Sequence, residues 1–172
     1  NIDETGIVIG GCIEVLKDLI GTKFDKTNEF LEKYKDEGII WYFDVFSMTS
    51  EALYNTLLQF KYAGWFKYAK AVIVGKVRFP NTFTDMKYED AVKRALPDVK
   101  SVFNFDIGHV KPSFTIINGM NARLISNDDE GRLRVGLPIL EDLIDKTPEE
   151  NCIIMLFHHP HTEIEEVIER ID

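Results

Sequence analysis

The feature that most constrains this chain is a repeated alternation of two kinds of segment. Short runs rich in β-branched and aromatic residues occur at residues 6–11, 39–46, 71–77 and 101–105. Their composition and length are typical of buried strands. Between them lie longer stretches whose apolar residues recur at helical spacing, at 12–20, 28–38, 50–63 and 88–96. Strands that alternate with helices predict a mixed α/β fold.

Start and stop residues support the predicted helices. Asn28 stands where an N-cap would begin the second helix, and Ser47 or Thr49 where one would begin the third. Gly64 ends the third helix and Pro97 closes the fourth. The predicted helices therefore have plausible boundaries as well as periodicity.

The second part of the chain is organised differently. Residues 114–117 and 122–125 are predicted to pair as a hairpin around Asn118-Gly119, and residues 133–135 to add a strand. Beyond Gly136 the sequence predicts a short helix at 139–144, a strand at 152–157 and an acidic helix with an Ile/Val stripe at 162–171. We divide the chain into a domain at 1–135 and a C-terminal extension at 136–172, to which no function is assigned.

Charge and composition exclude several classes of protein. The 172 residues carry a net charge of −9, with a pI near 5.0, which argues against a nucleic-acid partner. No apolar stretch is long enough for a membrane span. Cys12 and Cys152 lie in apolar runs and are interpreted as free thiols. The chain opens on Asn1 rather than Met and enters an apolar segment almost at once, so we interpret it as a fragment that begins partway through a longer protein. This N-terminus does not indicate a location, and a cytoplasmic one is our expectation.

Two residues outside the regular pattern could carry chemistry. Asp44 interrupts an apolar strand, where a buried carboxylate requires a partner. It could cap the next helix or meet solvent, or it could orient a histidine as a triad acid does. His109 lies in the loop after the 101–105 strand, next to Gly108. It could be a surface histidine or a general base.

The tail holds three histidines in four positions, His158, His159 and His161. They could ligate a metal in a metal-dependent hydrolase. Neighbouring side chains on an extended segment point to opposite faces, however, and no matching Asp- or His-rich motif lies upstream. An exposed loop is the favoured interpretation, and neither a metal nor another cofactor is predicted.

An ordered set of short motifs gives the chain a family resemblance. The motifs are Gly10-Gly11-Cys12-Ile13-Glu14-Val15-Leu16 with Leu19-Ile20-Gly21-Thr22, Ile40-Trp41-Tyr42-Phe43-Asp44, Leu57-Leu58-Gln59-Phe60 with Gly64-Trp65-Phe66, Val74-Gly75-Lys76, and Asp106-Ile107-Gly108-His109 with Pro112, Gly119 and Ala122. Together they span residues 6 to about 126 in the order found in LD-carboxypeptidases and the related microcin-immunity peptidases. The chain resembles the C-terminal domain of that family of serine peptidases.

This resemblance implies a site. The family's triad of Ser, Glu and His would place its acid at Asp44 and its histidine at His109, with Gly10, Gly11 and Cys12 contacting substrate. Two positions differ from the family pattern. Asp44 is one methylene shorter than Glu, and Cys12 replaces an Asn whose amide would help hold substrate.

The nucleophile would lie in an N-terminal domain that this sequence does not include. None of the serines considered as a substitute stands in a Gly-flanked strand-to-helix turn; they are Ser47, Ser50, Ser101, Ser113 and Ser126. The resemblance therefore implies a β/β/α swivelling domain that is catalytically silent alone. We expect it to pair with its N-terminal domain and to form a homodimer through the surface left uncovered.

The implied reaction is hydrolysis of the L,D-peptide bonds of muropeptides, or of a peptidyl-nucleotide antibiotic, through an acyl-enzyme. The alternative from another class is a homologue that binds or associates without catalysis. A less favoured third possibility is the metal-dependent hydrolase using the tail histidines.

Overall fold

The computed structural model describes residues 1–127, 131–136 and 154–155. Its strands form one mixed sheet in the order β4-β3-β2-β1-β5-β6-β7. The first four strands are mutually parallel, whereas β5, β6 and β7 add in antiparallel fashion beyond β1. In chain order the elements are β1 (Ile2–Cys12), α1 (Ile13–Leu16), the 3-10 turn η1 (Lys17–Leu19), α2 (Thr27–Lys33), β2 (Ile39–Asp44), α3 (Ser50–Tyr62), β3 (Ala69–Gly75), α4 (Tyr88–Ala95), β4 (Lys100–Phe105), β5 (Asn121–Ser126), β6 (Gly131–Gly136) and β7 (Ile154–Met155).

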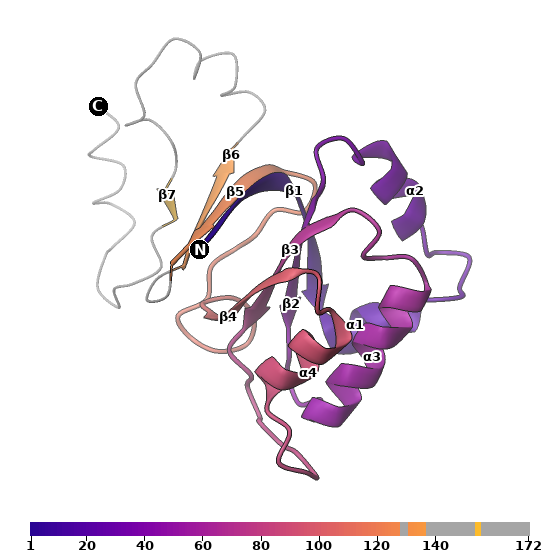
Figure 1. Ribbon diagram of the computed structural model, residues 1–172, viewed down its shortest axis with the longest axis vertical. Helices are drawn as coiled ribbons and strands as arrows, with labels where there is room; N and C mark the ends of the chain where they lie inside the picture. Colours follow the sequence, from indigo (N-terminus) through magenta and orange to yellow (C-terminus); the bar gives the residue numbers. More distant parts are fainter. Residues whose placement is uncertain (128–130, 137–153, 156–172) are drawn as a thin grey trace.

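Within the described residues, helices α1 to α4 lie on the same face of the parallel strands (Figure 1). Each crossover joins neighbouring strands in one direction along the sheet, and such crossovers share one hand, so the helices collect on one side. Side chains alternate accordingly: Trp41 and Phe43 face the helices, whereas Ile40 belongs to the opposite core. The predicted mixed α/β fold is confirmed.

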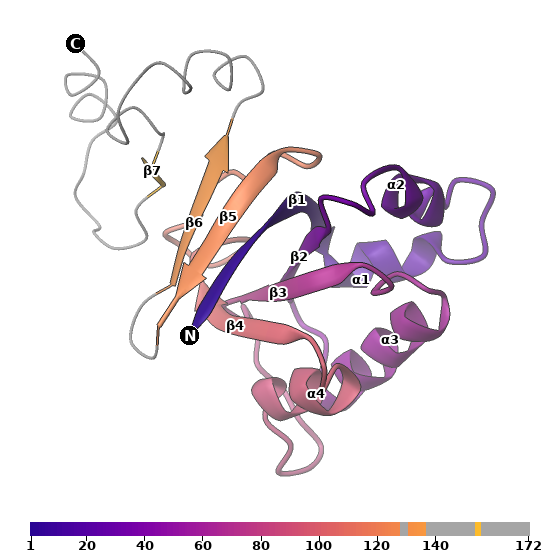
Figure 2. The same cartoon turned by 45° about the horizontal axis from the view of Figure 1, so that its top comes forward.

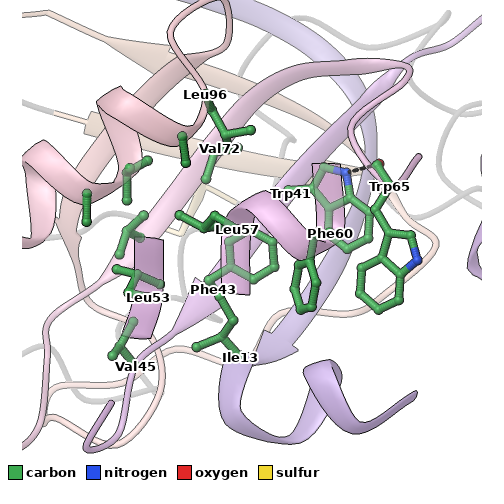
Figure 3. Packing of buried hydrophobic residues seen from close by; sticks show 14 of the residues in the cluster. Ile13, Trp41, Phe43, Val45, Leu53, Leu57, Phe60, Trp65, Val72 and Leu96 are labelled. Carbon is green, nitrogen blue, oxygen red and sulfur yellow. Dashed lines mark hydrogen bonds between the residues drawn. The ribbon is translucent and has the colours of Figure 1, made fainter. Parts of the chain in front are cut away.

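Aromatic rings fill the core beneath the helices. Trp41 and Trp65 stack with centroids 5.6 Å apart, and Phe60 packs 4.3 Å from the Trp65 ring (Figure 3). The Trp41 indole N–H donates to the Trp65 carbonyl oxygen at 3.0 Å, which satisfies a donor that burial would otherwise leave unpaired. This cluster fixes β2 against the end of α3.

A second, smaller core covers the other face of the sheet. The ribbons of β5 and β6 turn away from the parallel strands (Figure 2). Val8, Ile73 and Leu124 are buried there together with Ile107, which comes from the loop after β4. Packing of this loop against the sheet keeps the residues that follow Ile107 close to the strand ends.

Three local predictions are wrong. Residues 114–117 form no strand and no hairpin with β5, because β5 pairs instead with the open edge of β1 and with β6. The 12–20 helix is reduced to α1 and η1. Asn28 lies inside α2 and donates to the Ala63 carbonyl, so it is not the N-cap; Thr49 is the N-cap of α3, as predicted.

The described residues include little of the C-terminal extension. Ile154 and Met155 lie in β7, inside the strand predicted at 152–157. The helices predicted at 139–144 and 162–171, Cys152, and the histidines at 158, 159 and 161 lie outside the described residues. The division at residue 135 therefore stays a prediction.

Candidate active site

The candidate residues meet at one edge of the sheet, where the parallel strands end. Cys12 at the end of β1 lies opposite Asp44 at the end of β2. Gly75 at the end of β3 lies opposite Phe105 at the end of β4, and His109 follows four residues later. In α/β sheets, ligands bind at the carboxyl ends of the strands, which is where these residues gather.

Asp44 and His109 are in direct contact. Asp44 is only 4% exposed. One carboxylate oxygen accepts the backbone N–H of His109 at 3.2 Å, and the other contacts the ring nitrogen Nδ1. The His109 side chain is 49% exposed, so the ring is anchored on its inner side and open on its outer side. The fold thus brings together two residues that are 65 positions apart in the sequence.

Gly108 allows this contact. Its φ of +86° lies in the left-handed region, and a Cβ at this position would overlap the Asp44 carboxylate. The backbone of the loop therefore lies directly against the acid. This close approach brings His109 within reach of an acid that is one methylene shorter than the Glu of the family pattern.

The loop that carries His109 has its own anchors. Lys76, just after β3, forms an ion pair with the buried Asp106. The Asp106 carbonyl accepts the N–H of Phe114 at 2.9 Å, which draws the far side of the loop back to its start. Lys76 and Asp106 belong to the motifs of the family resemblance, and their ion pair holds the loop in place, a role that their sequence pattern does not reveal.

Asn118 is a residue whose role the sequence did not reveal. Its amide nitrogen donates to the Gly10 carbonyl at 3.1 Å, and its amide oxygen accepts the Gly10 N–H at 3.0 Å. A Cβ on Gly10 would overlap the Tyr42 carbonyl, so the strand needs glycine there. The Asn118 side chain thus makes the hydrogen bonds to Gly10 that a neighbouring strand would otherwise make. Asn118 and Gly119, which predicted a hairpin, form a turn that places this side chain beside β1.

The predicted substrate contacts Gly10, Gly11 and Cys12 lie beside the Asp44–His109 pair. The Cys12 thiol is partly exposed and donates to Glu14 Oε2 at 3.3 Å. Burial raises the pKa of this thiol, and the Glu14 carboxylate raises it further. The backbone polar groups of Gly10 are already engaged by Asn118. Contact with substrate at these positions remains a prediction.

Exposed apolar side chains surround this edge. They are Val15 after β1, Phe46 after β2, Phe79 after β3, and Ile117 next to Asn118, with exposed fractions of 65%, 38%, 51% and 51%. Phe46 and Phe79 pack edge to face with centroids 5.2 Å apart. Apolar groups gathered around a polar pair are typical of a surface that another domain or a ligand covers.

Neither a nucleophile nor a metal centre joins the pair within the described part of the chain. Among residues 1–127, 131–136 and 154–155, no serine hydroxyl bonds to His109, and no group of His, Cys, Asp and Glu could hold a metal ion. Over the same residues, no helix has the length and apolar character needed to cross a membrane.

Residues 5–124 match the family model for the LD-carboxypeptidase C-terminal domain. The chain belongs to this family. The match includes every motif that carries the resemblance up to Ala122, and it confirms that prediction.

Solved structures of family members share the fold. A muramoyltetrapeptide carboxypeptidase from Oxalobacter formigenes superposes with a TM-score of 0.63 at 21% identity, covering 79% of this chain and 47% of the relative. The microcin C7 self-immunity protein MccF superposes with a TM-score of 0.62 at 17% identity, covering 78% and 39%. The chain thus spans less than half the length of either relative. No protein with a curated description matches it.

Proposed function

We propose that this chain is the C-terminal part of a serine carboxypeptidase and supplies two members of a Ser-His-acid triad. The observation that carries the proposal is the double contact of the buried Asp44 carboxylate with Nδ1 and the backbone N–H of His109. An acid in this position fixes the tautomer and orientation of an imidazole, whose second nitrogen can then act as a base.

The serine would come from an N-terminal domain. The chain covers 47% of the Oxalobacter formigenes carboxypeptidase and 39% of MccF, so more than half of each of these relatives lies outside the matched region. Inter-domain contacts usually bury about 600–1,500 Å². The exposed apolar side chains around the strand ends would be covered by such a domain, which would also exclude water from the site.

In the proposed reaction, His109 Nε2 takes the proton of the serine hydroxyl as its oxygen attacks the scissile carbonyl carbon. The imidazolium then gives this proton to the leaving amine as the C–N bond breaks, leaving an ester on the serine. Water, deprotonated by the same nitrogen, hydrolyses this acyl-enzyme and restores the serine. Asp44 stays ionised throughout and stabilises the imidazolium.

The solved relatives suggest two candidate classes of substrate. One solved relative is a muramoyltetrapeptide carboxypeptidase, and MccF has been solved with aspartyl sulfamoyl adenosine. We propose an L,D-peptide bond of a muropeptide as the substrate, with a peptidyl-nucleotide as the alternative. No contact in the described residues separates these two.

The first experiment is to read the coding sequence upstream of Asn1 for a Gly-x-Ser strand-to-helix turn. The protein encoded with that segment is then assayed on an L-Lys–D-Ala tetrapeptide and on aspartyl sulfamoyl adenosine. His109→Ala should lower kcat by about 10⁶-fold, and Asp44→Asn by about 10⁴-fold, as loss of the corresponding triad members does elsewhere. Turnover that survives His109→Ala would remove the triad assignment.

A non-catalytic homologue is the second candidate, and Cys12 is the observation that favours it. Its thiol bonds to Glu14 and offers no amide to a substrate. An upstream segment without a nucleophile, combined with binding of the tetrapeptide but no hydrolysis, would favour this candidate.

A further inference from the structure

A carboxylate on α1 holds the loop that follows Asp44. Glu14 Oε1 accepts three successive backbone N–H groups, from Phe46 at 3.0 Å, Ser47 at 2.8 Å and Met48 at 2.8 Å. Its other oxygen accepts the Cys12 thiol. An ionised carboxylate suits this place because it is purely an acceptor, and bonds to a charged acceptor are about twice as strong as neutral ones.

The same loop carries a side chain that touches the histidine. The Phe46 ring lies with its centroid 4.8 Å from that of His109, at an interplanar angle of 60°. The Phe46 N–H is one of the three that Glu14 accepts, so the position of this ring depends on the carboxylate. Phe79 supports the ring from another side through its own edge-to-face contact.

His109 is therefore restrained from two directions. Asp44 holds Nδ1 and the backbone N–H, whereas the edge-to-face contact with Phe46 opposes rotation of the ring about the bond that joins it to the backbone. Nothing else among the described residues packs a ring against His109. A half-exposed imidazole without this contact could reach Asp44 in more than one ring orientation.

We propose that Glu14 is a positioning residue for His109, acting through the 46–48 loop and the Phe46 ring. This inference rests on the proposed function, in which His109 is the base. Burial would raise the pKa of Glu14, but the N–H groups of Ser47, Met48 and Phe46 outweigh it and hold the pKa below its ordinary value. The carboxylate is accordingly charged at neutral pH, as the proposal requires.

The test uses the 172-residue chain and NMR of the His109 ring, so it needs no activity. Phe46→Leu removes the aromatic ring and measures its ring-current contribution to the His109 proton shifts. Glu14→Ala should abolish at least half of that contribution, and Glu14→Gln should keep most of it because an amide oxygen can still accept. Glu32→Ala is the matched control; Glu32 accepts from Lys67 and Tyr68, far from the site, and its loss should leave His109 unchanged.

Amide exchange keeps the proposal testable if Glu14→Ala does not fold. In Glu14→Gln, the amides of Phe46, Ser47 and Met48 should exchange about tenfold faster than in the wild type, since neutral bonds replace charge-assisted ones. Unchanged exchange at these amides, or unchanged His109 shifts in a folded Glu14→Ala chain, would overturn the proposal.

Catalysis in the longer protein separates this inference from the proposed function. If Glu14 positions His109, Glu14→Ala should lower kcat about tenfold or more with KM little changed, the pattern of a transition-state effect. A wild-type protein with no hydrolysis would defeat the proposed function while leaving the NMR result standing. Full turnover in Glu14→Ala, alongside loss of turnover in His109→Ala, would defeat the positioning role alone.

Discussion

Gly108 provides a sharp test of how the loop meets the acid. The residue has a φ of +86°, and a Cβ placed on it would overlap the Asp44 carboxylate. Gly108→Ala therefore introduces two costs at once: a left-handed backbone for an L-residue, and displacement of the loop from Asp44. Gly119 shares the first cost without the second, because it has a φ of +87° and no atom within 4 Å of an added Cβ.

The expected magnitudes differ between the two sites. A left-handed conformation costs an L-residue about 1–2 kcal/mol, which applies to both substitutions. At Gly108 the loop must also move away, weakening hydrogen bonds to a charged carboxylate that contribute about 1.5–3 kcal/mol. Because the His109 ring is half-exposed to solvent, we take the contribution of these hydrogen bonds from the lower part of that range. We expect Gly108→Ala to lose about 1.5–2 kcal/mol more than Gly119→Ala.

Urea unfolding measures this difference. Fluorescence of the buried Trp41 and Trp65 reports the transition, and the free energies of unfolding of the two variants are compared with the wild type. The same comparison in an Asp44→Gly background completes the cycle, because this change also removes the Asp44 Cβ that lies 2.6 Å from the Cβ added at Gly108; there the two glycine substitutions should cost the same. Equal losses in the wild-type background, or a difference that persists without Asp44, would refute the role given to this contact.

Four further results are expected. Asp44→Glu, which restores the family's residue, should lower the free energy of unfolding by about 1–3 kcal/mol because the added methylene meets the Gly108 backbone; an unchanged urea midpoint would contradict this. The stability difference between the wild type and Glu14→Gln should be fully present above pH 4.5, the ordinary pKa of the carboxyl, and fall as the pH drops through the lower folded pKa; urea titrations at pH 7 and pH 3.5 check it, and a constant difference would be against it. The isolated chain should form a dimer in sedimentation experiments, and Phe79→Ser should weaken it if the exposed apolar edge is the interface. Stoichiometric zinc should leave the melting temperature unchanged, whereas a rise of several degrees would show that the tail histidines bind metal.

The sequence alone determined the regular part of the fold. Runs such as 39–46 and 71–77 carry their strand preference in local composition, and the helix at 50–63 shows its apolar period, N-cap and terminal glycine within one short stretch. Those properties depend on neighbours along the chain, so they can be recognised without tertiary contacts. The ordered motifs also identified the family, which the match over 5–124 confirms.

The hairpin that the sequence predicts around Asn118, and that the structure does not contain, shows where local patterns mislead. An Asn-Gly pair between apolar runs is typical of a two-residue turn, and the turn exists. Which strands pair, however, depends on which strand edges lack a hydrogen-bonded neighbour in the folded chain. The edge of β1 that does not face β2 is paired with β5. The Asn118 amide then occupied the remaining polar groups of Gly10, an arrangement across 108 positions that no local pattern records.

The site divides in the same way. Asp44 and His109 could be proposed as a pair from the sequence because a motif of the family resemblance ends at each of them; local pattern alone left a helix-capping acid and a surface histidine open. Their contact required the tertiary structure, because it depends on a glycine whose backbone lies against the acid. The roles of Glu14 and Phe46 also needed it. A glutamate on a short helix and a phenylalanine after a strand have no distinguishing local pattern, and only the packing of α1 beside the loop after β2 connects them to His109.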